Sequence, residues 1–555
     1  MALPVPASTS VLIVGGGPAG LLLAILLRQL DVACVVVEQR DGAQSAPAAH
    51  VVSARTLEIC RSAGVDMDAL ETVASAPEEG AWVRWVESLV GPEIGRVPFE
   101  GQHRFAQLFE SSPTPLRNLS QHVFEPVLRE QLGDVRDGCQ WVSAEEVSGG
   151  IVSKLRDTQT GEFQEIRSDY LVGCDGAGSS VRRFLGIAME GPEELQNFLA
   201  IHAEVDLSSV VGDRPATLYW ITDPAIQGTF IAHDISSTWV YMKEFNPGIE
   251  SLDDYPVERA EEIFRRASGI EQDVPLTVRH VTTWRMSCQI AESYRRGRIL
   301  LVGDAAHRFP PTGGLGLNTG VADAHNLAWK LALILRGLAP EALLDTYQSE
   351  RRPVAQRNAE VSLENAFRLL EVWMALDVTQ DPEESPRRSA AVLSTPEGRA
   401  TVTHAIENQA EHFDQLGIQL GYRYDATGVI SASDGSLPPV PSNPIREYQP
   451  TTYPGSRLPH VVLSRGEEII SSLDLVAPGE FLLLTFSPDW MKVEISFPLP
   501  LRRVWLGYDV TLLAGDFDNL SRDGAILVRP DQHVAWRTQS MPESARVVTF
   551  PLSLA

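Results

Sequence analysis

Three glycines near the start of the chain have the spacing that binds a dinucleotide. Gly15, Gly17 and Gly20 follow an apolar run and open an apolar helix. In the pattern G-x-G-x-x-G the first glycine permits a tight turn, the second lets backbone N–H groups approach a pyrophosphate, and the third permits close helix–strand packing. Glu38 stands eighteen residues after Gly20, where its carboxylate can accept hydrogen bonds from ribose hydroxyls. The other candidate residues of this dinucleotide site are Pro18, Ala19 and Gln39.

The residues around these glycines predict the elements that position them. Residues 11–14 are apolar and β-branched, as in a buried parallel strand, and residues 19–30 form an apolar helix. Residues 33–37 form a second buried strand that ends at Glu38. A lone G-x-G-x-x-G also occurs by chance in loops, but the complete pattern of strand, glycines, helix and strand predicts a Rossmann-type α/β fold with phosphate at the helix N-terminus.

Two later strands end in polar residues that suit the same ligand. Residues 170–174 form an apolar strand followed by Asp175 and Gly176, and the helix after them carries Arg182. Residues 298–302 form another apolar strand, which ends at Gly303 and Asp304. Because ligands of open α/β sheets bind at the carboxyl ends of strands, we expect these residues to face the dinucleotide.

A glycine-lined loop, residues 305–318, follows Asp304 and leads into a helix predicted over residues 319–336. Such a loop suits a flat, electron-poor ring, because the positive end of the helix dipole stabilises negative charge as the ring is reduced. The loop is therefore predicted to seat a flavin. Its candidate contact residues are Pro311, Gly314, Gly316, Leu317 and Asn318.

Residues 50–59 and 119–132 supply three more candidates. Ser53 can cap a helix whose first turn holds Arg55. A cation is unfavourable there unless an anion lies opposite it, so Arg55 either meets a cofactor phosphate or is simply solvated. Gln121 stands at the start of an amphipathic helix, where its amide can reach a cofactor. His50 lies five residues before Arg55, on the segment expected to pass the flavin.

Residues 198–245 contain alternating stretches that predict antiparallel strands of a separate sheet. These stretches are rich in Trp and Tyr, so the sheet can cover an aromatic ligand, although an ordinary sandwich face explains each side chain equally well. The side chains concerned are Tyr219, Trp220, His233 and Tyr241.

Composition excludes several classes of protein. The 555 residues exceed one ordinary domain, and a net charge of −27 without a basic run disfavours nucleic acid and anionic membranes as partners. Five scattered cysteines without a C-x-x-C pattern predict free thiols and no zinc site, and no metal ligand set is expected. The apolar N-terminus lacks the basic region of a signal peptide, and no run is long enough to span a membrane, so we expect a cytoplasmic protein.

Three motifs in this order resemble the FAD-dependent single-component aromatic hydroxylases, the family that contains p-hydroxybenzoate and phenol hydroxylases. They are the glycines at 15–20, the Asp175-Gly176 pair with Arg182, and the run from Gly303 to Asn318. Residues 47–56 are similar to the matching stretch of phenol-type hydroxylases, although Ala48 replaces the usual arginine and Ser53 a common asparagine.

The resemblance implies noncovalent FAD, with its ribose on Glu38, its pyrophosphate near Gly17, Arg55 and Gln121, and its ribityl chain on Asp304. It also implies that NAD(P)H visits transiently, since no second Rossmann motif is visible; the Asp175-Gly176 segment is associated in the family with both FAD and NAD(P)H. NADH and NADPH both remain open.

The resemblance also implies the domain organisation. Residues 1–190 with 280–375 form a discontinuous FAD-binding domain, 191–279 an inserted antiparallel-sheet substrate domain, and 376–440 a helical segment and linker. Residues 441–555 resemble a thioredoxin-like C-terminal domain, which has no cysteine for dithiol chemistry. We expect that domain to be structural or to form a subunit contact, as in a homodimer.

The predicted function is a monooxygenase that hydroxylates a small phenolic or aromatic substrate with NAD(P)H and O2 through a flavin C4a-hydroperoxide. Two alternatives remain: epoxidation or Baeyer–Villiger insertion on a polycyclic aromatic ketone, and a flavoprotein that only binds a partner. Pro311 belongs to the loop expected to exclude water. A base near the phenol would speed the reaction. His50 is the first candidate, because phenol-type relatives have a histidine there, and His233 and Tyr241 are the reserves; a plain loop histidine is the alternative.

Overall fold

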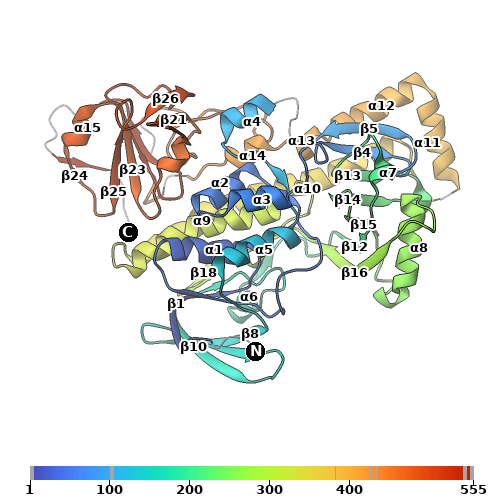
Figure 1. Ribbon diagram of the computed structural model, residues 1–555, viewed down its shortest axis with the longest axis horizontal. Coiled ribbons are helices and arrows are strands. Elements are labelled where there is room, and N and C mark those ends of the chain that lie inside the picture. The colour runs from blue at the N-terminus through green and yellow to red at the C-terminus, as the bar shows by residue number, and fades with distance from the viewer. Residues whose placement is uncertain are drawn as a thin grey trace.

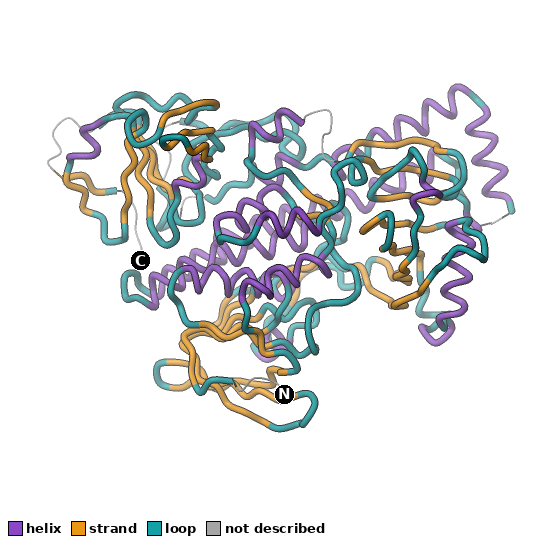
Figure 2. Tube along the Cα trace, in the orientation of Figure 1, coloured by secondary structure: helices purple, strands orange, loops and turns teal. Residues whose placement is uncertain are grey.

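The computed structural model describes residues 5–99, 105–379, 381, 383–425, 427–431, 436–541 and 547–550. Three strand-rich parts surround a central group of helices (Figure 2). None of the described helices combines the length and hydrophobicity that a membrane span requires.

The first part is an eight-stranded sheet that confirms the predicted Rossmann-type fold. Strand β1 pairs in parallel with β10 on one side and with β2 on the other. The order along the sheet is β18-β19-β10-β1-β2-β7, and a β8–β9 hairpin extends from β10. The strands are β1 (Ser8–Val14), β2 (Cys34–Val37), β7 (Val135–Arg136), β8 (Cys139–Val147), β9 (Gly150–Asp157), β10 (Phe163–Gly173), β18 (Arg295–Arg296) and β19 (Ile299–Leu301).

Helices α1 (Pro18–Gln29) and α9 (Leu315–Leu335) pack together on one face of this sheet (Figure 1). Both helices are apolar around most of their circumference, because each is covered by sheet, by its partner and by further helices. The other helices of this part are α2 (Ala54–Ser62), α3 (Met67–Val73), α5 (Gln121–Leu132) and α6 (Ser180–Phe184).

Helix α9 begins four residues earlier than predicted. Gly314 adopts the left-handed conformation (φ 63°) and serves as the N-cap. The amide of Asn318 then donates to the Gly314 carbonyl at 2.6 Å and closes the first turn. The glycines suggested a loop, yet Gly316, Leu317 and Asn318 belong to the helix.

The second part is a seven-stranded sheet with the order β16-β12-β15-β14-β13-β4-β5, covered on one face by α8 (Val257–Ser268). It draws on residues outside the expected 191–279 segment, since β4 and β5 come from the start of the chain and β4 pairs in parallel with β13. The strands are β4 (Trp82–Val86), β5 (Glu93–Pro98), β12 (Gln196–Glu204), β13 (Leu218–Ile221), β14 (Gly228–Asp234), β15 (Thr238–Glu244) and β16 (Thr277–Met286).

Short ribbons and helices connect the two sheets. The ribbon of β3 and β6 precedes α5, and β11, β17 and β20 form a small antiparallel sheet. The elements are β3 (Val51–Val52), β6 (Arg117–Asn118), β11 (Met189–Glu190), β17 (Gln289–Ala291), β20 (His307–Arg308), α4 (Phe105–Ser111), α7 (Ser208–Val211), α10 (Asp345–Ala375), α11 (Glu384–Ser394), α12 (Pro396–Glu407), α13 (Ala410–Phe413) and α14 (Leu416–Leu420).

The third part, at the C-terminal end, holds a four-stranded sheet with the order β25-β23-β27-β28 and its own apolar core. Strand β23 pairs in parallel with β25 and antiparallel with β27. The elements are β21 (Val462–Arg465), β22 (Glu468–Ser471), β23 (Phe481–Thr485), α15 (Pro488–Lys492), β24 (Glu494–Ser496), β25 (Leu501–Trp505), β26 (Thr511–Ala514), β27 (Ala525–Val528), β28 (Val534–Thr538) and β29 (Val547–Thr549).

Candidate active site

The loop between β1 and α1 has the geometry of a phosphate-binding turn. Gly15 has φ +112°, and a Cβ at this position would lie 2.2 Å from the Cys174 carbonyl oxygen. A Cβ on Gly20 would lie 2.1 Å from the Gly15 carbonyl oxygen, so helix and strand touch there. Gly17, the N-cap of α1, faces open space apart from one Glu125 oxygen at 4.0 Å from its Cβ position, and no side chain caps the helix. The first-turn N–H groups of α1 therefore remain available for a pyrophosphate.

Glu38 lies beside this turn at the end of β2. Its carboxylate accepts hydrogen bonds from the N–H of Gly16 at 2.8 Å and from the N–H of Arg40 at 2.9 Å. Burial alone would raise the pKa of Glu38, but the hydrogen bonds from Arg40 and Gly16 outweigh burial and lower it. Glu38 is thus an anionic acceptor next to the phosphate turn, as a ribose site requires. Gln39 is exposed.

Asp304 lies three residues after the end of β19, in the turn of Gly303–Ala305. Its side chain is exposed, yet desolvation by the surrounding protein raises the pKa of its carboxyl, with only partial compensation from His307 and Arg308. A carboxyl that is accessible but surrounded by protein is suited to accept hydrogen bonds from the hydroxyls of a ligand. A Cβ on Gly303 would lie 3.5 Å from that of Ala19, so the turn after β19 lies against the first turn of α1.

Like Gly17 at the start of α1, Gly316 at the start of α9 has free space where a side chain would stand. A Cβ on Gly316 would meet nothing within 4 Å, and no side chain caps α9. Asn318 donates to the Val51 carbonyl at 3.0 Å and accepts from the N–H of Ser53 at 2.9 Å. The amide thereby fixes α9 to the start of α2 rather than pointing to a ligand. Leu317 packs against the main core, and Pro311 is exposed.

Two predicted phosphate partners are engaged elsewhere, which corrects the prediction. The guanidinium of Arg55 is buried and donates to Gln532 Oε1 at 2.6 Å and to the Asp531 carbonyl at 3.0 Å, in the C-terminal part. The guanidinium of Arg182 donates to the carbonyls of Ala305 and Ala177. Neither side chain is a free cation, because each serves to join segments of the fold.

Asp175 and Gln121 also have local partners. Oδ2 of Asp175 accepts from the N–H groups of Ser180 and Val181, so this carboxylate caps α6. Gly176 has a positive φ and an open Cβ position. The amide of Gln121 donates to Glu125 Oε1 at 2.7 Å, which brings it next to the open side of Gly17. Gln121 begins α5 and stays a predicted contact of the cofactor.

His50 lies where the two sheets meet. Its Nδ1 is 2.9 Å from Oδ1 of Asn118, and the Asn118 amide nitrogen donates to Ser75 and to the Ala232 carbonyl. Since Asn118 uses its nitrogen as the donor, its oxygen must accept from His50, which leaves Nε2 of a neutral His50 as an acceptor. Burial lowers the pKa of His50, partly offset by Asn118, so this imidazole is neutral but a weaker base than the predicted group near pH 7.

The remaining candidates lie on β13, β14 and β15, where side chains alternate between the two faces of the sheet. Tyr219 and Tyr241 lie in the cluster beneath α8, and the Tyr241 hydroxyl donates to the Ile226 carbonyl at 2.9 Å. Tyr241 is therefore wrong as a reserve base, since it faces away from the first sheet. His233 lies on the opposite face, with its ring 5.2 Å from that of His50. Trp220 packs against another cluster on that opposite face.

Sequence reasoning missed three polar residues here, namely Asn118, His122 and His202. The ring of His122 lies 6.2 Å from that of His233, and burial lowers its pKa. Its position next to Gln121 at a helix start was the available signal. Among the described residues no group of three or more His, Cys, Asp or Glu side chains is arranged to hold a metal ion.

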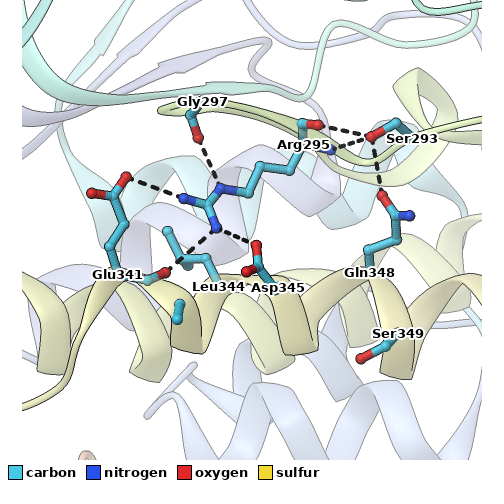
Figure 3. Close-up of a pocket in the computed structure, with 9 residues that line it drawn as sticks. Ser293, Arg295, Gly297, Glu341, Leu344, Asp345, Gln348 and Ser349 are labelled. Atoms are coloured by element: carbon cyan, nitrogen blue, oxygen red, sulfur yellow. Dashed lines mark hydrogen bonds and ion pairs between the residues drawn. The ribbon is translucent and has the colours of Figure 1, made fainter. Parts of the chain in front are cut away.

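A surface hollow of about 630 Å³ lies away from these residues (Figure 3). The guanidinium of Arg295 crosses it and pairs with Glu341 and Asp345, while its Nε donates to the Gly297 carbonyl. None of the predicted site residues lines this hollow. Its polar groups already satisfy one another, so we do not assign the active site to it.

A Rossmann-type sheet with two open helix N-termini, an anionic ribose acceptor and a second sheet against it defines an FAD-dependent oxidoreductase. The chain belongs to the FAD-dependent aromatic-ring monooxygenases: the family model described as "FAD binding domain" matches residues 8–362, and "Aromatic-ring hydroxylase, C-terminal" matches residues 451–549. These matches confirm the predicted family, cofactor and class of reaction, with NAD(P)H as the cosubstrate typical of the family.

Curated relatives and solved structures agree. The chain is 32% identical to a 2,4-dichlorophenol 6-monooxygenase of Cupriavidus pinatubonensis, covering 97% of this chain and 94% of the relative. It is 33% identical to a putative polyketide hydroxylase of Streptomyces halstedii, covering 98% and 97%. A crystal structure of the flavin-dependent monooxygenase PieE with FAD and substrate superposes with a TM-score of 0.87 at 33% identity, covering 96% of each chain.

Proposed function

We propose that this monooxygenase hydroxylates a phenolic ring whose hydroxyl lies against Nε2 of His50. The observation that carries this proposal is the hydrogen bond from His50 Nδ1 to Asn118. It leaves the second nitrogen as an acceptor for the phenol proton. A phenolate is far more nucleophilic than a phenol, so partial removal of the proton speeds attack on an electrophilic oxygen.

The chain's own residues fit FAD at both ends. The N-terminus of α1 at Gly17 would hold the pyrophosphate, with Pro18, Ala19 and Gln121 beside it, and Glu38 the adenosine ribose. Asp304 would hold the ribityl hydroxyls, and the N-terminus of α9 at Gly316 would lie under the ring. Bound FAD would accept two electrons from NAD(P)H and would then react with O2. Pro311, which is exposed, would limit the entry of water.

We infer that NAD(P)H binds transiently and from outside. The sequence has one G-x-G-x-x-G turn, which we assign to FAD, so no second turn of this kind is left for NAD(P)H. The guanidinium of Arg182, on the helix after the Asp175-Gly176 turn, donates to backbone carbonyls, so we assign it no role in binding NAD(P)H. We still propose that NAD(P)H binds near the open turn at Gly176.

The test is a screen of phenols with the FAD-loaded protein. A true substrate should stimulate NAD(P)H oxidation and yield a product heavier by one oxygen atom, which labelled O2 must supply. Insertion of oxygen into a carbon–carbon bond or formation of an epoxide would identify the alternative reactions. Absence of any substrate-dependent oxygen incorporation across the panel would contradict the proposal.

We further propose the division into an FAD-binding unit (1–190 with 280–375), a substrate unit (191–279) whose sheet is completed by β4 and β5, a helical segment with a linker (376–440) and a thioredoxin-like unit (441–555). One face of the C-terminal strands has an apolar cluster of its own, which supports the last of these, while the other face packs against the main core. We propose a cytoplasmic protein, supported by five cysteines that are all unpaired. A homodimer is proposed from the resemblance, and gel filtration with light scattering tests it.

A further inference from the structure

One face of the seven-stranded sheet is turned away from α8 and toward His50. On β12 the side chains of Leu199, Ile201 and Ala203 enter the core beneath α8, so the alternation places His202 on the opposite face. His202 pairs across strands with Val240 of β15. Val240 pairs in turn with Ile231 of β14, two residues before His233. His202 and His233 therefore share this face, two strands apart.

The floor between the two histidines is apolar. Val240 and Ile231, both buried, continue the row of His202 across the sheet, and Ala200 and Met242 form the next row on the side away from His233. None of the four belongs to a packed hydrophobic cluster of the described residues. Apolar side chains that are buried without joining a core suit the wall of a space that receives an aromatic ring.

Both histidines have an unpaired buried nitrogen. Nδ1 of His202 and Nδ1 of His233 are inaccessible to solvent and have no hydrogen-bond partner among the described residues, and the two residues are 8% and 5% exposed. Burial, followed by the neighbouring His280 and His122, lowers the pKa of His202 to about 4. A neutral imidazole offers one donor and one acceptor, and a buried polar atom without a partner is unfavourable unless a ligand supplies one.

We propose that His202 binds a second oxygen of the substrate, a hydroxyl or carbonyl at the end remote from His50, and that the substrate has at least two fused aromatic rings. His233 lies beside His50, whereas His202 is two strands further on, about 10 Å across the sheet. A single phenol ring held at His50 does not reach that far. The proposal rests on the proposed function, because it takes the ring at His50 as the one that reacts.

The test compares two ligands that differ by one remote hydroxyl, 2-naphthol and naphthalene-2,6-diol. Their dissociation constants are measured by calorimetry on the FAD-loaded full-length protein. The wild type should bind the diol about tenfold more tightly, the usual net value of one hydrogen bond. His202→Leu should lose this preference and bind 2-naphthol as the wild type does, and His202→Gln should recover part of it.

The matched control is His280→Leu. His280 stacks on His202 at 5.5 Å but is exposed, and its Nε2 lies 3.4 Å from Ser45 Oγ. This variant should keep the preference for the diol. Equal binding of both ligands by the wild type, or a preference that survives in His202→Leu, would overturn the subsite, and so would failure of both ligands to bind.

Product analysis separates this result from the proposed function. If the wild type prefers the diol through His202 but hydroxylates neither compound, the subsite stands and phenol hydroxylation at His50 fails for these ligands. If both compounds are hydroxylated without any difference in affinity, the proposed function stands and the subsite is wrong.

Discussion

Asn118 holds His50 at 2.9 Å and at the same time donates to the Ala232 carbonyl of β14 at 3.1 Å. One amide thus joins the ribbon of the FAD-binding part to the substrate-facing sheet and sets the tautomer of the histidine between them. The candidate base is therefore fixed relative to both units. Its orientation does not depend on a mobile rotamer, as a positioned proton acceptor requires.

The first prediction concerns His50 itself. His50→Ala should lower hydroxylation about 10²-fold, the low end for loss of a general base. FAD should stay bound, and NAD(P)H oxidation should continue with release of hydrogen peroxide, which a coupled peroxidase assay measures. His50→Gln is the matched control, because it can accept a hydrogen bond but cannot take up a proton. Wild-type hydroxylation by His50→Ala at neutral and alkaline pH would remove the assignment.

The second prediction concerns Asn118, the hydrogen-bond partner of His50. Asn118→Asp places a carboxylate at the Nδ1 hydrogen of His50, and a nearby opposite charge raises the pKa of an imidazole by about one unit or more. Protonated His50 cannot accept a proton, so the acid-side loss of hydroxylation should move to higher pH. The measurement is the pH profile of product formation. A profile that keeps its position, with FAD content unchanged, would show that His50 does not titrate in the reaction.

The third prediction compares two glycines of one turn. Gly17→Ala should fold normally, since its Cβ position is open to 4.0 Å, but should bind FAD at least about tenfold more weakly because the methyl group enters the pyrophosphate site. Gly20→Ala should fold poorly, because its Cβ would lie 2.1 Å from the Gly15 carbonyl oxygen. Flavin released on ultrafiltration and the melting temperature of the apoprotein separate the two effects. Equal FAD affinity of Gly17→Ala and wild type would contradict the placement.

The local sequence was sufficient for the phosphate turn. The glycines at 15–20 and the acidic end of β2 act through neighbours in the same strand–helix–strand unit, so their spacing alone determined their geometry. Arg55 failed for the opposite reason. Arg55 pairs with Glu58 three residues later, but its other partners, Asp531 and Gln532, lie at the other end of the chain, and no local pattern predicts that their loop packs onto α2.

The substrate-facing sheet shows a second limit. Alternation in β14 and β15 correctly separates His233 from Tyr241, but period two alone gives two faces without saying which one meets the FAD-binding part. That choice is made by α8, which covers the Tyr241 face with side chains such as Phe264. Strand β4 joins this sheet from residues far upstream, a parallel pairing that no local pattern predicts.

The fourth prediction tests that orientation. Tyr241→Phe should leave substrate affinity and hydroxylation unchanged, because the ring lies beneath α8. It should lower the free energy of unfolding by about 1 kcal/mol, since the hydroxyl loses its hydrogen bond to the Ile226 carbonyl. Steady-state kinetics and a urea titration measure the two quantities. A large loss of hydroxylation with normal stability would place Tyr241 at the substrate after all.

The last prediction concerns the buried ions that join the C-terminal part to α10. Glu350 is 1% exposed and accepts from both terminal nitrogens of Arg529 and from Lys330 at 2.7–2.8 Å. Burial would raise the pKa of Glu350, but Arg529 and Lys330 outweigh burial and lower it from 4.5 to about 2.

A carboxyl whose pKa is lower in the folded protein stabilises it above the unfolded pKa, and this contribution is lost as the pH falls from about 4.5 toward 2. Glu350→Gln should lower the free energy of unfolding by about 3–5 kcal/mol at neutral pH, because Lys330 stays buried without its anion and Arg529 keeps only Asp531. The variant should also lose less stability than the wild type between neutral and acid pH. Glu341→Gln, at a 41% exposed side chain, is the control and should change stability by less than about 1 kcal/mol. Urea titrations at several pH values measure the free energy of unfolding of each variant. If the stability of Glu350→Gln fell with pH in parallel with that of the wild type, Glu350 would not carry this charge.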